Sequence, residues 1–410
     1  MASRSACYGK ESFHSRWLFE EKLSAVETTP AIRKTALNAV HRAMGAKMVE
    51  FNGWDMPVEY PSAGGIIAEH MAVRTGVGIF DVSHMGDIRL QGRQALDAVQ
   101  HISMNDAARL AIGQAQYSAL LYPQGTFVDD VIVHRLGEDD YLLVINAGTR
   151  EKDFNWVRDN TRQFDCKVEN LSDDFTQIAI QGPKGVDLLQ KLTDANLGAV
   201  KFYWVTRGNI LVMEHNVRRY LQNILIARTG YTAEDGFEIY VPADEKTSAM
   251  VWNQVLEAGK EFGVVPCGLG ARNTLRLEGK LPLYGHEISD TINVWEAGLE
   301  RFCKMEKAEF VGRDALEKAR AAGLKRTLVG LEMVERGIAR DGYKVLDDGG
   351  REIGYVTSGS YAPFLKKNIA LAYVPPDFGD VGSTVNVEIR GQGVKAQVVP
   401  TPFYKRAKKG

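Results

Sequence analysis

Two adjacent carboxylates inside an apolar run are the first candidates for chemistry. Asp129 and Asp130 lie in residues 127–133, which read FVDDVIV. Successive side chains of a strand point to opposite faces, so each aspartate shares a face with apolar neighbours. An unpaired buried carboxylate is costly and its pKa rises, which proteins tolerate mainly where the group has a partner or a task. The pattern does not choose between the two, and it leaves open that one lies at a bulge while the other faces water.

A polar loop bracketed by glycines and a later arginine are the next candidates. The loop covers residues 228–238 (RTGYTAEDGFE). A carboxylate such as Glu238 can accept two hydrogen bonds from the amidine-like edge of a heterocycle. Arg272 follows in residues 268–273 (GLGARN), near an expected helix start, where its guanidinium can bind a carboxylate in bidentate fashion. The alternatives are an ordinary surface loop and a solvated or salt-bridged arginine.

Residues 80–86 (FDVSHMG) contain the residue types of a hydrolase triad. Alternation along a strand places Asp81 and Ser83 on one face and His84 on the other, so these neighbours cannot form a triad. The sequence also has no G-x-S-x-G segment. A serine hydrolase is therefore not predicted.

Composition excludes several classes of protein. The 410 residues are 45% hydrophobic and 25% charged, which is typical of a globular protein with more than one domain. A formal net charge of -2 argues against a nucleic-acid binder, and no apolar run approaches the about 18 residues that span a bilayer. No G-x-G-x-x-G follows a strand, so no Rossmann dinucleotide site is predicted. The sequence has four cysteines that are far apart and form no C-x-x-C pair: Cys7, Cys166, Cys267 and Cys303. They predict no disulfide framework and indicate a reducing compartment. The histidines form no H-E-x-x-H motif, so no metal site is predicted either.

The elements that must position these residues follow two patterns. Helical spacing is expected from Thr28-Thr29-Pro30 to Gly45, over 67–74, 94–102 and 151–159, after Gly182-Pro183, from Asp244 to about 262, and over 313–322. Period-two apolar runs predict strands over 117–122, 127–136, 141–146, 177–180, 202–214, 217–228 and 237–241. Short turns join several consecutive strands, so antiparallel sheets and an α+β class are predicted.

The composition changes near residue 320, where a domain boundary is expected. Five short β runs with glycine turns follow, over 328–333, 343–346, 353–357, 369–374 and 385–389, and predict a small barrel or sandwich. Three parts are therefore expected: 1–29, 30–315 and 316–410. The first faintly resembles a transit peptide, but its glutamates weaken that interpretation, and a disordered extension is the prediction.

A dozen short motifs occur in a specific order between about residues 30 and 405. They are residues 45–57 (GAKMVEFNGWDMP), 72–74 (AVR), 80–86, 129–130, 181–183 (QGP), 228–232 (RTGYT), 234–238 (EDGFE), 268–272 (GLGAR), 276–278 (RLE), 283–285 (LYG), 357–359 (TSG) and 402–404 (PFY). In this order the chain resembles the aminomethyltransferase (T-protein) family of the glycine cleavage system.

The resemblance implies a three-domain clover-leaf around a central folate cavity, with two ferredoxin-like α+β domains and a C-terminal β-barrel. It implies transfer of the methylene carbon from the aminomethyl-lipoyl arm of the H-protein to tetrahydrofolate. The products are 5,10-methylenetetrahydrofolate, ammonia and the dihydrolipoyl arm. The implied partners are the lipoylated H-protein and, transiently, the other glycine cleavage components, with no nucleic acid, membrane, metal or nucleotide. The expected location is the cytoplasm, or the mitochondrial matrix if the source is eukaryotic and residues 1–29 are a transit peptide.

Matched residue by residue, Asp130 takes the position of the family's catalytic aspartate, and Asp129 supports it. Glu238 takes the position that reads the pterin guanidine edge, and Arg272 that of a binding arginine. Other matched positions line the cavity or close it with aromatic rings: Tyr117, Asn146, Tyr231, Phe403 and Tyr404.

The chain departs from the family pattern in three places. Ala233 stands where glycine is commoner, and alanine tolerates positive φ poorly, which predicts a slightly different loop. Asn273 replaces an aspartate, which weakens the anchoring expected for Arg272, and Leu281 stands where some members have tyrosine.

Two other folate proteins are alternatives to the transferase. One is a demethylase on the same fold, often fused to a flavin domain, which this chain lacks. The other is a non-enzymatic folate-binding relative, which carries a Lys-Gly-Cys-Tyr motif, whereas residues 279–287 contain no cysteine.

Overall fold

The computed structural model describes residues 31–407. By its contacts the chain divides into Met1–Ala31 and Ile32–Gly410, and the second unit is described below. The extension expected over 1–29, the predicted helix start at Thr28–Pro30 and Cys7 lie outside the described residues. The part of the predicted first helix that is described starts only at Asn38, as α1 (Asn38–Ala43).

The first sheet confirms the predicted meander and is antiparallel throughout. Its order is β5-β6-β7-β4-β8, with β5 (Ala115–Leu121), β6 (Phe127–Gly137), β7 (Asp140–Ile145), β4 (Gly86–Gln91) and β8 (Lys167–Asn170). Helices α3 (Ala95–Ile102) and α4 (Arg150–Asn160) share an apolar core with one face, which includes Val131, Val133 and Leu143. Alternation therefore turns Ile132 and Val144 to the face that these helices leave uncovered.

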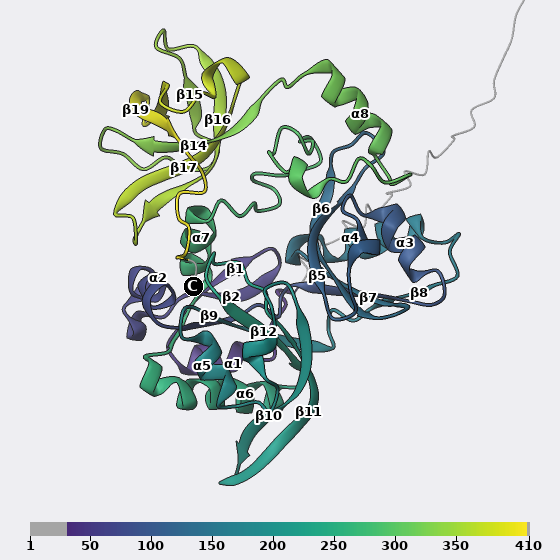
Figure 1. The fold of residues 1–410 in the computed structure, drawn as a ribbon. Coiled ribbons are helices and arrows are strands. Elements are labelled where there is room, and N and C mark those ends of the chain that lie inside the picture. The colour runs from purple at the N-terminus through teal and green to yellow at the C-terminus, as the bar shows by residue number, and fades with distance from the viewer. Residues whose placement is uncertain (1–30, 408–410) are drawn as a thin grey trace, which may run out of the picture. The chain divides into compact units, whose positions relative to one another are not determined.

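The second sheet has the order β10-β11-β12-β9-β3-β13. Its strands are β10 (Val205–Glu214), β11 (Val217–Ala227), β12 (Gly236–Pro242), β9 (Phe175–Gln181), β3 (Gly78–Asp81) and β13 (Val265–Pro266). All pairs are antiparallel except β13 with β3, so the wholly antiparallel expectation is wrong at this edge. The long hairpin of β10 and β11 turns at His215 and Asn216, as predicted, and both residues have positive φ. Figure 1 shows this hairpin extending beyond the rest of the sheet.

On one face of the second sheet, Phe80 and Ala179 pack against Val73, Ala271 and Leu275, and three helices cover the other face. That face packs with α1, α5 (Gly185–Gln190) and α6 (Glu245–Gly259) around Ile180, Ile226 and Phe237. Asp244 caps α6 as predicted, since its Oδ1 accepts a hydrogen bond from Thr247 N at 2.8 Å. The faces of the two sheets that point away from α1, α3, α4, α5 and α6 meet in an apolar cluster: Leu142, Val144, Leu225, Ala227 and Tyr240.

A hairpin and two helices pack between the sheets and the C-terminal part. The hairpin of β1 (Lys47–Phe51) and β2 (Trp54–Glu59) is absent from the sequence prediction. Helix α2 (Gly65–Thr75) ends at Gly76 as expected, and it packs against α7 (Leu269–Glu278). Helix α7 also contacts β2 and the barrel strand β16. Short 3-10 turns complete this region and the loops: η1 (Pro61–Ala63), η2 (Ala107–Arg109), η3 (Ala147–Thr149), η4 (Leu197–Ala199), η5 (Lys260–Phe262), η6 (Glu300–Phe302) and η7 (Pro376–Phe378).

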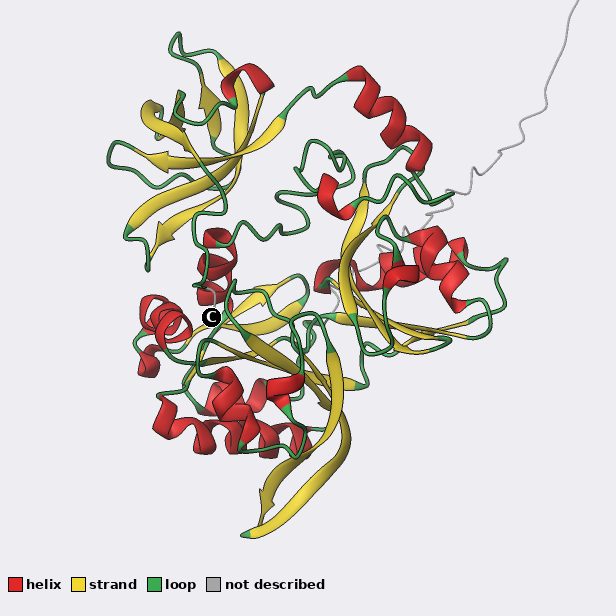
Figure 2. Cartoon of the chain, in the orientation of Figure 1, coloured by secondary structure: helices red, strands yellow, loops and turns green. Residues whose placement is uncertain are grey.

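The C-terminal part is a closed barrel that follows α8 (Arg313–Ala322) (Figure 2). Its order is β14-β17-β16-β15-β18-β19, with β14 (Thr327–Met333), β17 (Lys367–Val374), β16 (Glu352–Ala362), β15 (Lys344–Leu346), β18 (Thr384–Ile389) and β19 (Gln392–Val399). The five predicted strands are all present, and β19 is the sixth. The α+β class with a C-terminal barrel is confirmed. No helix within residues 31–407 is long and apolar enough to cross a membrane.

Candidate active site

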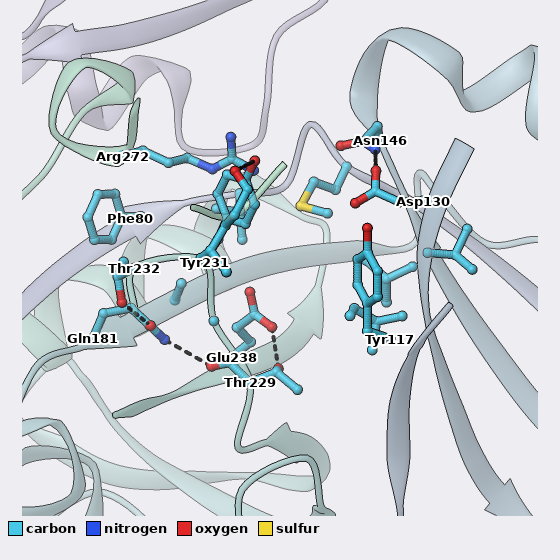
Figure 3. A pocket seen from close by; sticks show the side chains of 18 of the residues that line it. Phe80, Tyr117, Asp130, Asn146, Gln181, Thr229, Tyr231, Thr232, Glu238 and Arg272 are labelled. Atoms are coloured by element: carbon cyan, nitrogen blue, oxygen red, sulfur yellow. Dashed lines mark hydrogen bonds between the residues drawn. The ribbon is translucent and has the colours of Figure 1, made fainter. Parts of the chain in front are cut away.

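A pocket lies between the faces of the two sheets that meet in the apolar cluster around Tyr240 (Figure 3). The first sheet contributes Tyr117, Asp130, Ile132, His134 and Val144, with Asn146 directly after β7. The second sheet and its loops contribute Phe80, Ala179, Gln181, Thr229, Gly230, Tyr231, Thr232, Glu238 and Tyr240. Arg272 from α7, Leu281 and Pro282 also line it. Of the residues predicted for the site, the pocket brings together Tyr117, Asp130, Asn146, Tyr231, Glu238 and Arg272.

Strand β6 separates the two adjacent aspartates. Asp130 faces the pocket, whereas Asp129 is fully buried behind it. The Nδ2 of Asn146 donates to Asp129 Oδ1 and to Asp130 Oδ1, at 2.8 Å each. Thr149 Oγ1 also donates to Asp129 Oδ2 at 2.8 Å. Asp129 therefore holds Asn146, and Asn146 in turn holds the carboxylate that enters the pocket.

Asp130 has an unusual proton affinity because of this setting. Burial, and then the negative charge of Asp129, raise the pKa of Asp130 to about 7, while the hydrogen bond from Asn146 opposes the rise. The Tyr117 hydroxyl points toward the same carboxylate (Figure 3). A carboxyl group with a pKa near neutrality is able to hold or release a proton at the pH at which an enzyme works.

Glu238 enters the pocket from the opposite sheet. It lies on β12, paired with Ala227 of β11 and Ala179 of β9, so the ladder fixes its backbone on both sides. The Thr229 hydroxyl donates to Glu238 Oε2. Burial raises the pKa of Glu238, whereas the Thr229 hydrogen bond and the charge of Arg272 oppose the rise. One carboxylate oxygen thus has a fixed donor, and the other is free to receive donors from a ligand.

Arg272 closes the pocket from α7. Its guanidinium carbon lies 4.4 Å from the ring centroid of Tyr231, whose hydroxyl donates to the Pro282 carbonyl. Burial lowers the pKa of Arg272, and its buried Nε has no hydrogen-bond partner among the described residues. Asn273 does not anchor this side chain, since its Oδ1 accepts from Arg276 Nε at 2.9 Å. The Arg272 charge is therefore available to a ligand.

A second, more polar pocket adjoins the first. It shares Met85, Asn146 and Arg272 with the first pocket, and its lining is completed by Phe51, Asn52, His84, Ala147, Gly148, Thr149, Leu283, Tyr284 and Gly285. His84 is buried, and burial lowers its pKa to about 3. The side chains that separate the two pockets thus include the amide that holds Asp130.

Strand β3 ends at Asp81 and residues 83–84 form a turn, so the alternation expected along a strand does not reach Ser83 and His84. Asp81 accepts from Ser83 Oγ at 2.5 Å and from Thr35 Oγ1 at 2.6 Å, and it lies 3.0 Å from His41 Nε2. His84 instead lines the second pocket. Asp81, Ser83 and His41 are fully or almost fully buried, so their hydrogen bonds tie α1 to β3.

Phe403 and Tyr404, predicted to close the cavity, do not line either pocket. Phe403 packs against an apolar cluster that includes Leu328, Ile369 and Leu371 of the barrel. Tyr404 N donates to the Glu278 carbonyl at 2.8 Å, and the Arg74 guanidinium lies 3.9 Å from the Tyr404 ring centroid. The basic cluster after them contributes Arg406, which lies 3.6 Å from Asp235. Tyr404 and Arg406 thus lie beside the loop 229–235 rather than inside the pocket.

The sequence prediction gave no role to several polar residues of the pocket. Gln181 belongs to a short motif and Thr229 to the polar loop, and neither pattern shows that the Thr229 hydroxyl contacts Glu238. Alternation along the two strands would have found His134 and Tyr240, since they lie an even number of residues from Asp130 and Glu238. Within residues 31–407, no group of three or more His, Cys, Asp or Glu side chains is arranged to hold a metal ion.

Comparisons with known proteins cover nearly all of the described chain. The family model of the GCVT N-terminal domain matches residues 37–307, and that of the glycine cleavage T-protein C-terminal barrel domain matches residues 326–405. The aminomethyltransferase of Koribacter versatilis is 72% identical over 378 residues, which is 92% of this chain and 97% of the relative. That of Acidobacterium capsulatum is 66% identical over 380 residues, 92% of this chain and 98% of the relative.

A solved structure extends the similarity to the fold. The glycine cleavage system aminomethyltransferase T from Bartonella henselae matches with a TM-score of 0.83 and 33% identity, covering 91% of this chain and 98% of that chain. Both the sequence matches and the structural match span the two sheets and the barrel. The chain therefore belongs to the aminomethyltransferase family, the T-proteins of the glycine cleavage system.

Proposed function

We propose that this aminomethyltransferase transfers the methylene carbon from the aminomethyl-lipoyl arm of the H-protein to tetrahydrofolate. The observation that carries the proposal is the placement of Asp130 and Glu238 on opposite walls of one pocket. Each has a raised pKa, and each is held by a donor from its own wall. Paired acidic groups of this kind suit a ligand with a polar ring at one end and a reacting amine at the other.

Glu238 is the proposed partner of the pterin ring. The guanidine-like edge of a pterin presents parallel N–H donors, which a carboxylate accepts with geometric specificity. Thr229 already occupies one side of Glu238, so the ligand meets a carboxylate of fixed orientation. Further along the pocket, the buried Tyr240 hydroxyl and Arg272 Nε have no partner within residues 31–407. Buried polar atoms usually find partners, and a pterin with its amines supplies them.

Asp130 is the proposed catalytic residue. In the transfer, the carbon–sulfur bond to the lipoyl arm and the carbon–nitrogen bond to the departing ammonia both break, and two carbon–nitrogen bonds form, to N5 and N10 of the folate. The two protons that these folate nitrogens lose go to the lipoyl thiol and to the leaving amine. Positive iminium character develops on the transferred carbon, and a preorganised carboxylate beside it stabilises that charge. A pKa near 7 also allows Asp130 to exchange a proton with the departing amine. Arg272, which lines both pockets, is the proposed contact for a folate carboxylate or for the lipoyl end.

The proposed partner is the lipoylated H-protein, with transient contacts to the other glycine cleavage components. The bacterial relatives support the cytoplasm as the place of the reaction. The domain boundaries at residues 29 and 315 remain proposals, although the two family matches flank the second one, ending at 307 and starting at 326.

The test is ammonia release from aminomethylated H-protein, with and without tetrahydrofolate. Fast release that requires folate, with an equal yield of methylenetetrahydrofolate, is the expected result. If folate binds but no such release occurs, the transferase proposal is wrong. N-methyl and S-methyl substrates would then test the demethylase alternative.

A further inference from the structure

We propose that Gln181 is a positioning residue that sets the affinity of the pocket for folate through Thr229 and Glu238. The proposal rests on the proposed function, since it takes folate as the ligand of this pocket. Gln181 is the last residue of β9 and is 1% exposed. Its ladder partners are glycines on both sides, Gly236 of β12 and Gly78 of β3. A Cβ at Gly236 would lie 2.7 Å from Gln181 Nε2, so the missing side chain makes room for the amide.

The amide holds the pocket loop at two points. Gln181 Nε2 donates to the Thr229 carbonyl at 3.0 Å, and Thr232 Oγ1 donates to Gln181 Oε1 at 2.8 Å. Figure 3 shows both bonds on the same wall of the pocket. Thr229 and Thr232 are almost fully buried, so neither the carbonyl nor the hydroxyl has water as a replacement partner.

The loop backbone is pressed against this amide at Gly230. A Cβ there would lie 2.0 Å from Gln181 Oε1, whereas the φ of Gly230 is outside the left-handed region. Close approach, and not an unusual backbone conformation, is therefore what requires glycine at this position. The path of the loop is thus set by the Gln181 side chain.

Thr229 passes this constraint to the ligand site. Its carbonyl is held by Gln181, and its hydroxyl donates to Glu238 Oε2. Gln181 also lines the pocket, but both polar atoms of its amide are already bonded within the protein. The role that these bonds give Gln181 is to orient the carboxylate that meets the ligand.

The test measures binding of 5-formyltetrahydrofolate by calorimetry, and kcat and KM with aminomethylated H-protein. Gln181→Met keeps the size of the side chain but removes both hydrogen bonds. We expect Kd and KM for folate to rise about tenfold, with kcat at saturating folate within about twofold. The matched control is Gln177→Met, on the same strand, where a buried amide donates to Asp87 instead. Its folate Kd is expected to stay at the wild-type value.

A double-variant cycle shows whether Gln181 acts through Thr229. Thr229→Val is expected to weaken binding about as much as Gln181→Met, and the pair no more than the worse single variant. Effects that multiply, to about a hundredfold, would show independent actions and overturn the proposal.

Steric rescue gives a second test. Gly230→Ala is expected to weaken folate binding because the new Cβ meets the Gln181 amide. Gln181→Ala in the same chain removes the clash, so the double variant should bind more tightly than Gly230→Ala alone. An unchanged Kd in Gln181→Met, in a protein with a normal melting curve, contradicts the positioning role. A wild-type protein that binds no folate contradicts the proposed function instead.

Discussion

The amide of Asn146 joins two carboxylates that have different roles. It donates to Asp129 and to Asp130, and Asp129 is further held by Thr149. Asp129 is inaccessible, so it acts on the pocket indirectly, by holding Asn146 and by raising the pKa of Asp130. The position and the pKa of the reacting carboxylate thus depend on a residue that no substrate reaches.

The first prediction concerns Asp130→Asn, which keeps the shape of the side chain but removes its charge and its ability to exchange a proton. Turnover is expected to fall at least about a hundredfold, because charge stabilisation and proton transfer are both lost. The folate Kd should stay within about threefold, since Asp130 lies on the wall opposite Glu238. Ammonia release and calorimetry measure the two effects.

Glu238→Gln is the contrasting control for Asp130→Asn. It should chiefly weaken folate binding and leave kcat at saturation nearly intact. A near wild-type rate in Asp130→Asn would remove this residue from catalysis, and an unchanged folate Kd in Glu238→Gln would remove it from pterin binding.

The second prediction concerns pH. The hydrogen bond from Asn146 lowers the pKa of Asp130 against the effects of burial and of Asp129. In Asn146→Ala that opposition is lost, so the pKa of Asp130 rises further. If the ionised form is active, the acid limb of kcat moves to higher pH, by about one unit. The kcat–pH profile between pH 5.5 and about pH 9 measures the shift. A move toward lower pH would show that another group controls the limb.

At the scale of elements, the pocket loop is held by residues from distant segments. Arg74 of α2 donates to the Thr232 carbonyl at 2.6 Å and to Glu234 Oε1 at 3.0 Å. Its guanidinium lies against the Tyr404 ring, and Tyr404 N donates to the Glu278 carbonyl. Helix α2, helix α7 and residues near 404 together brace one side of the loop.

The third prediction therefore concerns Tyr404→Ala. Loss of the ring leaves the Arg74 guanidinium without its stacking partner, a contact worth about 0.5–2 kcal/mol. Hydrogen exchange should increase over residues 229–235, and the folate Kd should rise about threefold to tenfold. Tyr361→Ala, which removes a half-exposed ring from the barrel, is the control. Equal exchange in both variants would show that the tail does not brace the loop.

The fourth prediction concerns Ala233 in the same loop. The sequence predicted a slightly different loop, because alanine replaces the commoner glycine. In the structure Ala233 takes a φ of 61°, the left-handed conformation that glycine adopts without strain. Ala233→Gly should therefore raise the free energy of unfolding by about 0.5–1 kcal/mol, after the greater entropy of unfolded glycine is subtracted. Chemical denaturation measures this gain. Asn216→Gly should gain less, since asparagine tolerates its φ of 64°. A loss of stability in Ala233→Gly would contradict the strain.

Local patterns predicted most of these elements, and two of the missed elements carry local signals as well. The meander, the hairpin after residue 205 and five barrel strands follow from alternation and turn residues. Strand β19 (QGVKAQVV) carries a period-two signal that the prediction did not use, since Val394, Ala396 and Val398 alternate with Lys395 and Gln397. The hairpin of β1 and β2 carries a sequence signal that the prediction did not use, which is the dipeptide Asn52-Gly53. Both residues have positive φ in the structure, as a tight hairpin turn requires.

At the scale of the whole molecule, buried polar groups join the barrel to helix α7. Arg276 of α7 donates to Glu287 Oε2 and to Ser358 Oγ of the barrel, each at 2.7 Å. Thr357 Oγ1 donates to Glu287 Oε1 at 2.7 Å. The barrel is thus attached to α7, the helix that supplies Arg272 to the pocket.

The fifth prediction concerns Asp87, whose pKa burial raises to about 8. An unfolded aspartate ionises near pH 4, so between about pH 4 and pH 8 the folded state retains a proton that the unfolded state releases. Stability therefore falls as pH rises through this window. Asp87→Asn removes the effect, and it should stabilise by on the order of 5 kcal/mol at pH 8 but little near pH 4. Denaturant titrations at the two pH values measure it, and equal effects at both would contradict the assignment.

Local sequence patterns could not predict how the residues of the site come together. Asp130, Glu238 and Arg272 are each at least 34 residues apart in the chain, as their numbers show, and come from two sheets and a helix. Periodicity places a side chain on a face of its own strand, but it does not say which faces meet. The resemblance of the motifs indicated that these residues belong together. It did not give the contacts that Gln181, Thr229 and Tyr404 make.

The bracing of the loop by Tyr404 also has a consequence during synthesis. A ribosome makes every residue that lines the pocket before it makes residues 402–406, with the whole barrel in between. At about 5–20 residues per second, translation leaves an interval of seconds in which the pocket walls exist without the contacts of Tyr404. We expect nascent chains in that interval to bind folate more weakly than the finished protein, so that full affinity is acquired only after the barrel has emerged.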